Sequence, residues 1–216
     1  EMCIRYSRWL AAQGYLVAVV DYRVLPEVEY PAFLDDCAAA VRWVTDHAPR
    51  YGGAAGRPAL MGHSAGAYNA VMLALDKRYG LARHIAAVVG LSGPYDFYPF
   101  NEPIGRRTFA AVPDPQSTQP INHVGPHAPP MLLASGDDDT LVGPQNTRSL
   151  AARLRAVGSE AVELHLPRFK HPGTLLELGT PLGGRSHLTA EIVAFLARHL
   201  KSGVTAPVGY DRSRMR

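Results

Sequence analysis

Apolar residues follow two patterns along this chain, short unbroken runs and runs with helical spacing. Unbroken runs are typical of buried strands, and they lie at residues 15–23, 59–63, 85–93, 131–136 and 161–166. Apolar residues three and four positions apart predict helices at residues 2–13, 31–47, 64–77, 144–157, 174–178 and 187–199. Because the strands alternate with helices, the pattern predicts an α/β fold with a mostly parallel sheet and helices on both faces.

One long segment, residues 94–130, interrupts this alternation. It is rich in prolines, aromatic residues and polar residues and has no sustained period. This composition predicts an irregular, cap-like excursion and not another layer of the core. We therefore expect one domain over residues 1–201, with residues 202–216 forming a disordered tail.

Length and composition fit one globular domain, since the chain has 216 residues of which 47% are hydrophobic. The net charge of +3 is spread along the chain without a basic stripe between aromatics, so we expect no nucleic-acid partner. Cys3 and Cys37 are too few for a disulfide framework and lie in no metal-binding motif. No run is long enough for a membrane span and no signal peptide is visible, so we expect a cytoplasmic protein; the oligomeric state stays open.

The motif with the clearest chemistry is GHSAG at residues 62–66, which lies between a predicted strand and a predicted helix. This setting favours a nucleophile at Ser64 over a structural serine, because a sharp turn would hold Ser64 in a strained, exposed conformation. Gly62 and Gly66 would avoid clashes with the strand and the helix. His63 cannot be the base, since adjacent residues on a sharp turn point apart, and we expect it to pack or bond beneath the turn.

Together with the preceding DYRVLPEVEYPAFLDDCAAAVRWV, the GHSAG motif resembles the α/β-hydrolase superfamily, specifically bacterial carboxylesterases and lipases. The resemblance covers about residues 3–200. It implies a serine hydrolase that cleaves small carboxylic esters through an acyl-enzyme and a Ser-His-Asp triad, without a metal or an organic cofactor. It also implies that the acid follows the strand after the excursion and that the histidine follows the last strand.

Three aspartates compete for the role of the triad acid in MLLASGDDDTLVG. The spacing found in the similar esterases, applied from Gly136 to Val142, selects Asp139. Asp137 and Asp138 are then turn or capping residues, which is the ordinary role of aspartate in such loops. Asp96, which follows the preceding strand, is a minor rival.

His171 is the expected base, because it lies just past the end of a predicted strand at the place that the resemblance implies. An imidazole can take and return a proton near neutral pH. His187 is the second choice. The remaining histidines have ordinary positions in helices, in a strand or in the excursion: His47, His84, His123, His127, His165 and His199.

The expected oxyanion hole is incomplete in this sequence. The backbone N–H of Ala65, at the start of the helix, supplies one donor. The resemblance places the other donors in an HGGG-type loop before the first helix, and the chain lacks this loop and the first three strands of the fold. One of these strands would lie between residues 15–23 and 59–63. We expect a piece of a longer protein that hydrolyses esters poorly by itself, and equal activity from a longer chain would contradict this.

Substrate selection is expected in the excursion, where Tyr95, Phe97, Tyr98 and Phe100 could line an apolar pocket for short acyl groups. The same aromatics could equally pack the excursion onto the sheet. Two other functions stay open: an arylformamidase-type amide hydrolase, because the fold alone does not separate amides from esters, and a non-catalytic module that has kept the triad.

Overall fold

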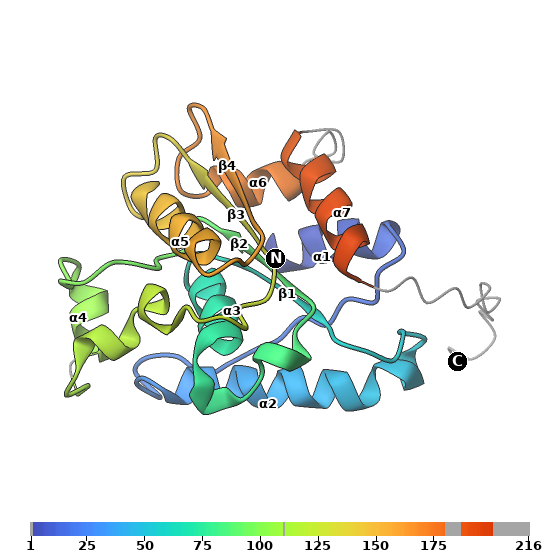
Figure 1. Cartoon of the computed structure of the whole chain (residues 1–216), viewed down its shortest axis with the longest axis horizontal. Coiled ribbons are helices and arrows are strands. Elements are labelled where there is room, and N and C mark those ends of the chain that lie inside the picture. Colours follow the sequence, from blue (N-terminus) through green and yellow to red (C-terminus); the bar gives the residue numbers. More distant parts are fainter. Residues whose placement is uncertain (1, 110, 180–186, 201–216) are drawn as a thin grey trace.

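Four parallel strands form one sheet in the computed structural model, which describes residues 2–109, 111–179 and 187–200 (Figure 1). The strands are β1 (Ala59–His63), β2 (Ala87–Leu91), β3 (Met131–Gly136) and β4 (Ala161–Leu166). They pair in the order β1-β2-β3-β4. Since all the pairs are parallel, the carboxyl ends of the strands meet at one edge of the sheet. The prediction of a parallel α/β sheet is confirmed.

Helices cover both faces of this sheet (Figure 1). One core cluster contains α2 (Ala32–His47), α3 (Ala65–Leu75) and α5 (Gln145–Ala156). The other contains α1 (Met2–Ala12), α6 (Gly173–Gly179) and α7 (His187–His199). Successive side chains of a strand point to opposite faces, so Val88 packs in the first cluster and Val89 in the second.

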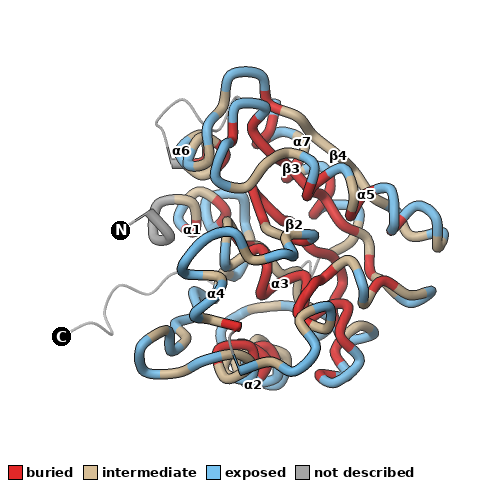
Figure 2. Tube along the Cα trace, turned by 90° about the vertical axis from the view of Figure 1, so that its left-hand side faces the viewer, coloured by how far each residue is buried: buried red, intermediate tan, exposed pale blue. Residues whose placement is uncertain are grey.

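The two central strands are buried along their whole length, as Figure 2 shows in red. Burial on both faces explains why β2 and β3 appear in the sequence as unbroken apolar runs. The edge strands β1 and β4 are mostly half-buried. The predicted strands at 59–63, 131–136 and 161–166 have the observed bounds, and the predicted helices agree with the observed ones to within about two residues at most ends.

The excursion (residues 94–130) contains α4 (Pro103–Phe109) and two short 3₁₀ turns, Pro115–Thr118 and Pro120–His123. Its described residues form no strand, in agreement with the prediction of an irregular segment. Asn146 fixes its start, because Oδ1 accepts hydrogen bonds from the N–H groups of Tyr95 and Asp96, both at 2.8 Å. Gln119 Oε1 accepts the next two N–H groups at 2.7 and 3.0 Å.

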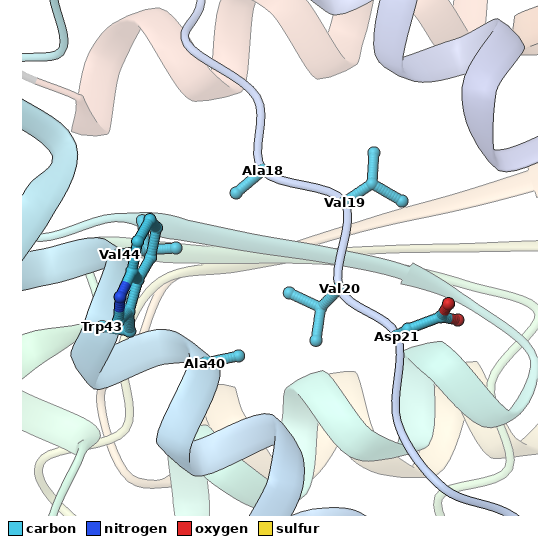
Figure 3. A pocket seen from close by; sticks show the side chains of 7 residues that line it. All are labelled: Ala18, Val19, Val20, Asp21, Ala40, Trp43 and Val44. Carbon is cyan, nitrogen blue, oxygen red and sulfur yellow. The ribbon is translucent and has the colours of Figure 1, made fainter. Parts of the chain in front are cut away.

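The predicted strand at residues 15–23 is wrong, because this segment is extended but forms no ladder. Within the described part of the chain, residues 16–21 make no backbone hydrogen bond to another segment. Figure 3 shows the side chains still alternating, with Ala18 and Val20 pointing toward α2 and Val19 pointing away. A strand exists only when a second segment supplies hydrogen bonds, and an apolar sequence cannot supply them alone.

A hollow of about 270 Å³ lies between this extended segment and α2, whose Ala40, Trp43 and Val44 line it (Figure 3). The apolar side chains around it reach solvent, and Trp43 is 49% exposed. The end of the segment is fixed to α2, since the Arg23 guanidinium donates to both carboxylate oxygens of Asp36 at 2.9 and 2.7 Å.

The predicted tail, residues 202–216, lies outside the described residues. None of the helices in the described ranges has the length and apolar character needed to cross a membrane.

Candidate active site

The serine, aspartate and histidine of the predicted triad lie together at the carboxyl edge of the sheet. Ser64 follows β1, Asp139 follows β3 and His171 follows β4. Residues separated by 107 positions in the sequence therefore meet, because parallel strands all end at this edge. This is the edge where ligands bind in open parallel sheets.

Ser64 occupies a sharp turn between strand and helix, with φ 54° and ψ −121°. This conformation is unfavourable for a residue with a Cβ and costs about 1–3 kcal/mol, so the surroundings must impose it. The Ser64 N–H donates to the Leu91 carbonyl at 2.9 Å, which extends the β1–β2 ladder by one residue. The Ser64 carbonyl accepts from the Tyr68 N–H at 3.0 Å, which begins α3. The ladder and the helix thus hold the serine from both sides.

The two glycines of the motif differ in their need for small size. A Cβ on Gly62 would lie 2.2 Å from the backbone carbonyl carbon of Gly66, so only glycine fits there. A Cβ on Gly66 would meet nothing within 4 Å among the described neighbours. The clash expected at Gly66 is therefore not found, because its Cβ would point into open space.

A chain of hydrogen bonds connects the three side chains. His171 Nε2 lies 2.9 Å from Ser64 Oγ, and His171 Nδ1 lies 2.8 Å from Asp139 Oδ2. A carboxylate only accepts, so the matching tautomer has a proton on Nδ1 and a lone pair on Nε2 that accepts from the serine hydroxyl. This arrangement can remove a proton from Ser64 while a negative charge faces the imidazole.

Asp139 is the buried member of the three consecutive aspartates, with a side chain that is 0% exposed. Its Oδ1 accepts hydrogen bonds from the N–H groups of Leu141 and Val142 at 3.0 and 2.9 Å. These bonds orient the other oxygen toward His171. Asp137 and Asp138 are exposed, and the rival Asp96 is exposed as well.

The loop that carries His171 is held against the ends of β2 and β3. The Asp138 N–H donates to the Phe169 carbonyl at 3.1 Å, and that carbonyl would lie 2.1 Å from a Cβ on Gly136. Beyond the loop, the buried hydroxyls of Ser92 and Thr174 lie 3.0 Å apart. These supports join residues that are distant in the sequence, so no local pattern indicates them.

The second-choice histidine has no comparable position. The His187 side chain is 71% exposed, and its Nδ1 lies 3.9 Å from Glu191 on the same helix. High exposure and a weak contact on the surface are the ordinary state of a surface histidine. The structure thus brings His171, and not His187, to the serine.

His63, beside the serine, contacts the loop of His171. Its Nε2 lies 2.9 Å from the His171 carbonyl oxygen, and the two rings are 4.9 Å apart at an angle of 50°. Burial lowers the pKa of His63, and a charge on nearby His171 lowers it too, against the opposing effects of the carbonyl and of Asp139. The expectation that His63 would bond beneath the turn did not specify this partner.

Ala65 is the first residue of α3. The first N–H groups of a helix have no partner within it, and the helix dipole makes this end attractive to negative charge. Ala65 is also exposed. Its N–H is therefore free of the helix ladder next to Ser64.

Among the aromatics of the excursion, Tyr95 lies in the core. Its side chain is 0% exposed, and its ring occupies the space over Gly90 and Gly93. A Cβ on either glycine would lie within 2.5 Å of the tyrosine. Tyr95 thus packs the excursion onto the sheet, as the alternative interpretation expected, and it does not face a substrate space.

The other aromatics of the excursion form a cluster on α3. Phe97 packs edge-on against Tyr68, one helical turn after Ser64, with 5.8 Å between ring centroids. Phe100 packs against Phe97 at 5.6 Å, and Tyr98 packs against Phe100 at 5.3 Å. Phe97 and Phe100 are half-buried and Tyr98 is 45% exposed, so these rings retain surface that a ligand can contact.

The residues described here contain no group of three or more His, Cys, Asp or Glu side chains arranged to hold a metal ion. Cys37 is buried as a free thiol, and burial raises the pKa of this thiol to about 11.

Comparison with solved structures supports the fold. A carboxylesterase of Lactobacillus plantarum WCFS1 superposes with a TM-score of 0.72 at 18% identity, over 89% of this chain and 76% of that one. An acetyl ester-xyloside bifunctional hydrolase of Caldicellulosiruptor lactoaceticus gives a TM-score of 0.72 at 22% identity, over 89% and 74%.

Sequence comparison finds related esterases. Esterase LipC of Mycobacterium tuberculosis is 31% identical over 86% of this chain and 50% of its own length. The isoprenylcysteine α-carbonyl methylesterase ICME of Arabidopsis thaliana is 28% identical over 94% and 55%. The chain thus spans about half the length of these relatives. Residues 2–154 match the BD-FAE family. The chain therefore belongs to the BD-FAE family, within the α/β-hydrolase superfamily.

Proposed function

We propose that this protein hydrolyses small carboxylic esters, with Ser64 as nucleophile, His171 as general base and acid, and Asp139 as the residue that orients the base. The observation that carries the proposal is the continuous hydrogen-bond chain from Ser64 Oγ through His171 to Asp139. The relatives named as esterases support the same reaction class.

In the first half of the reaction, Ser64 Oγ attacks the ester carbonyl carbon while its proton passes to His171 Nε2. The carbonyl oxygen becomes negative in the tetrahedral intermediate, and we propose the Ala65 N–H as one donor to it. The imidazolium then gives its proton to the departing alkoxide oxygen. The carbon–oxygen bond breaks, and the alcohol leaves an acyl group on Ser64.

In the second half, water replaces the serine as the attacking group. His171 Nε2 accepts a proton from the water, and the resulting hydroxide forms a bond to the acyl carbon. Proton return to Ser64 Oγ accompanies cleavage of the acyl bond and releases the carboxylic acid. Asp139 stays ionised throughout and stabilises the charge on His171, for which its two backbone hydrogen bonds prepare it.

Short acyl groups are the proposed substrates, with Phe97, Tyr98 and Phe100 contacting the acyl chain. The aromatic cluster lies against Tyr68, one helical turn after the nucleophile, and keeps exposed surface. Phe97→Ala and Phe100→Ala should change the ratio of acetate to octanoate ester hydrolysis. Tyr51→Ala, which removes an exposed ring that packs on Trp43, is the matched control and should leave the ratio unchanged. An unaltered ratio in both phenylalanine variants would contradict the assignment.

The deciding experiment is covalent labelling with a fluorophosphonate, read by mass spectrometry on the peptide that contains Ser64. Wild type should react, Ser64→Ala should not, and Asp139→Asn should react about 10³- to 10⁴-fold more slowly because the imidazole loses its orienting acceptor. A panel of p-nitrophenyl acetate and an N-formyl arylamine then separates ester from amide hydrolysis. A folded wild type that is unreactive toward the probe would sink the proposal.

A further inference from the structure

The catalytic loop receives a side-chain hydrogen bond from the residue that precedes the nucleophile. His63 Nε2 lies 2.9 Å from the backbone oxygen of His171. His171 lies in the loop of residues 167–172, so the side chain of His63 contacts the backbone of this loop. An apolar residue in place of His63 would leave the His171 carbonyl without this side-chain donor.

The contact links the two elements whose relative position matters most. His63 ends β1 and is bonded covalently to Ser64, whose conformation is fixed by the ladder and by α3. His171 belongs to the loop between β4 and α6, on the far side of the sheet order. A hydrogen bond from His63 to the His171 main chain thus fixes the loop of the base relative to the nucleophile. It does not involve the reacting atoms.

We infer that His63 is a positioning residue for His171: its Nε2–H fixes the His171 carbonyl and thereby keeps the imidazole within hydrogen-bonding distance of Ser64. This inference rests on the proposed function, since it concerns how the base is held. The geometry requires one tautomer. A carbonyl only accepts, so the proton of neutral His63 must be on Nε2 and not on Nδ1.

The charge of His63 also affects how easily His171 can become positively charged. During the reaction His171 becomes an imidazolium, and its ring lies 4.9 Å from that of His63. A second positive charge at this distance would oppose the first, whereas Asp139, which contacts His171 Nδ1, favours it. Burial and the neighbouring His171 lower the pKa of His63 more than its bond to the His171 carbonyl and Asp139 raise it, which favours a neutral ring beside the charged base.

Purely local packing of His63 would have a different signature. Packing depends on the shape and volume of the ring, and a leucine of similar size would replace much of it. Positioning depends on a neutral N–H donor at the place of Nε2. Glutamine can place an amide N–H there, so His63→Gln and His63→Leu separate the two roles.

The first test reads the geometry without any activity. In ¹⁵N-histidine-labelled protein near neutral pH, His63 should be neutral with its proton on Nε2, as shown by its two ring-nitrogen shifts. A neutral His63 with the proton on Nδ1 would overturn the inference, because the bond to the His171 carbonyl could not exist. This result stands whether or not the proposed ester hydrolysis is correct.

The second test measures the rate of fluorophosphonate labelling at Ser64. His63→Leu should label about tenfold more slowly, as expected for the loss of one positioning hydrogen bond, and His63→Gln should stay within about threefold of wild type. The matched control is His165→Leu, which removes a half-buried histidine that bonds Glu163 at 2.8 Å and does not contact His171. It should label within about twofold of wild type.

The labelling rates separate a positioning role of His63 from a packing role. Equal losses in His63→Gln and His63→Leu would overturn the inference, since they would show that the ring and not the donor is needed. An unchanged rate in folded His63→Leu would also overturn it. If wild type itself does not label, the proposed function fails, and the tautomer measurement still decides whether His63 holds the loop.

Discussion

Two apolar stretches of this chain have similar sequences, but one forms a buried strand and the other an exposed segment outside the sheet. Residues 87–91 form β2, whose five residues are buried between β1 and β3. Residues 16–20 are extended and equally apolar, yet Leu16 is 51% and Val19 57% exposed. The difference lies in the neighbours and not in the residues themselves. Sheet formation is a property of pairs of segments, and an apolar run becomes a strand only beside a partner.

The candidate active site depends on the well-paired region. Ser64 is held by a ladder bond to Leu91 and by the start of α3, and the loop of His171 is held by the ends of β2 and β3. Exact placement of side chains requires rigid elements with satisfied hydrogen bonds. The extended segment contributes no residue to the triad, so its lack of a ladder leaves the triad geometry intact.

The largest expected difference between the two regions is in hydrogen exchange. Amides of β2 and β3 are bonded within the ladder and should open only with global unfolding. Amides of residues 16–20 have no backbone partner among the described residues and should exchange almost as freely as an unfolded peptide. We expect protection factors to differ by at least about 10³. Similar protection in both segments, measured by NMR or mass spectrometry, would contradict the comparison.

A matched pair of leucines gives the next largest effect. Leu133 in β3 is 0% exposed, and Leu133→Ala should lower the free energy of unfolding by about 2–5 kcal/mol through lost burial and a cavity. Leu16→Ala, the same change in the extended segment, should cost under about 1 kcal/mol because half of that side chain is already in water. Urea unfolding of the two variants measures both. Equal costs would mean that the extended segment is as well packed as the sheet.

The sequence allowed most elements to be predicted because their signals are local. Periodicity located α2 and α7, and unbroken apolar runs located β1, β3 and β4. The strand at residues 15–23 could not be predicted correctly, because its ladder depends on a second segment. The prediction of a clash at Gly66 was wrong for a similar reason, since the direction of a Cβ depends on the backbone around it.

In the candidate site, too, some residues could be predicted from the sequence and some contacts could not. Ser64 could be found from the local motif, and the resemblance to known esterases supplied the register for Asp139 and His171. The bond from His63 to the His171 carbonyl joins residues 108 positions apart, and no spacing in the sequence indicates it. Asn146 likewise fixes the start of the excursion from 50 residues away. Such contacts become visible only when the strands bring distant loops to one edge.

A third prediction tests how closely the turn at Ser64 is packed. Gly62→Ala should lower the free energy of unfolding by about 1–3 kcal/mol or more, because the new Cβ would lie 2.2 Å from backbone atoms that cannot rotate away. Gly66→Ala should be neutral or stabilising by up to about 1 kcal/mol, since that position is helical and open. Thermal unfolding compares them. A stable Gly62→Ala variant would show that β1 and α3 can separate, which would make the site region less rigid than argued.

The smallest expected effect is the pH dependence that His63 adds to stability. Burial lowers the pKa of His63 in the folded protein below the ordinary value of 6.5, so the unfolded chain binds the proton more readily. Stability contributed by neutral His63 is therefore fully present above about pH 6.5 and is lost as the pH falls toward the folded pKa. His63→Gln has no such group, so its free energy of unfolding should fall less on acidification than that of wild type. The two proteins differ only at position 63, so the difference between their free energies of unfolding, measured by urea unfolding at several pH values, reports on this residue. A difference that stays constant with pH would mean that the folded structure does not disfavour a charge on His63, and it would remove the reason for its neutrality beside His171.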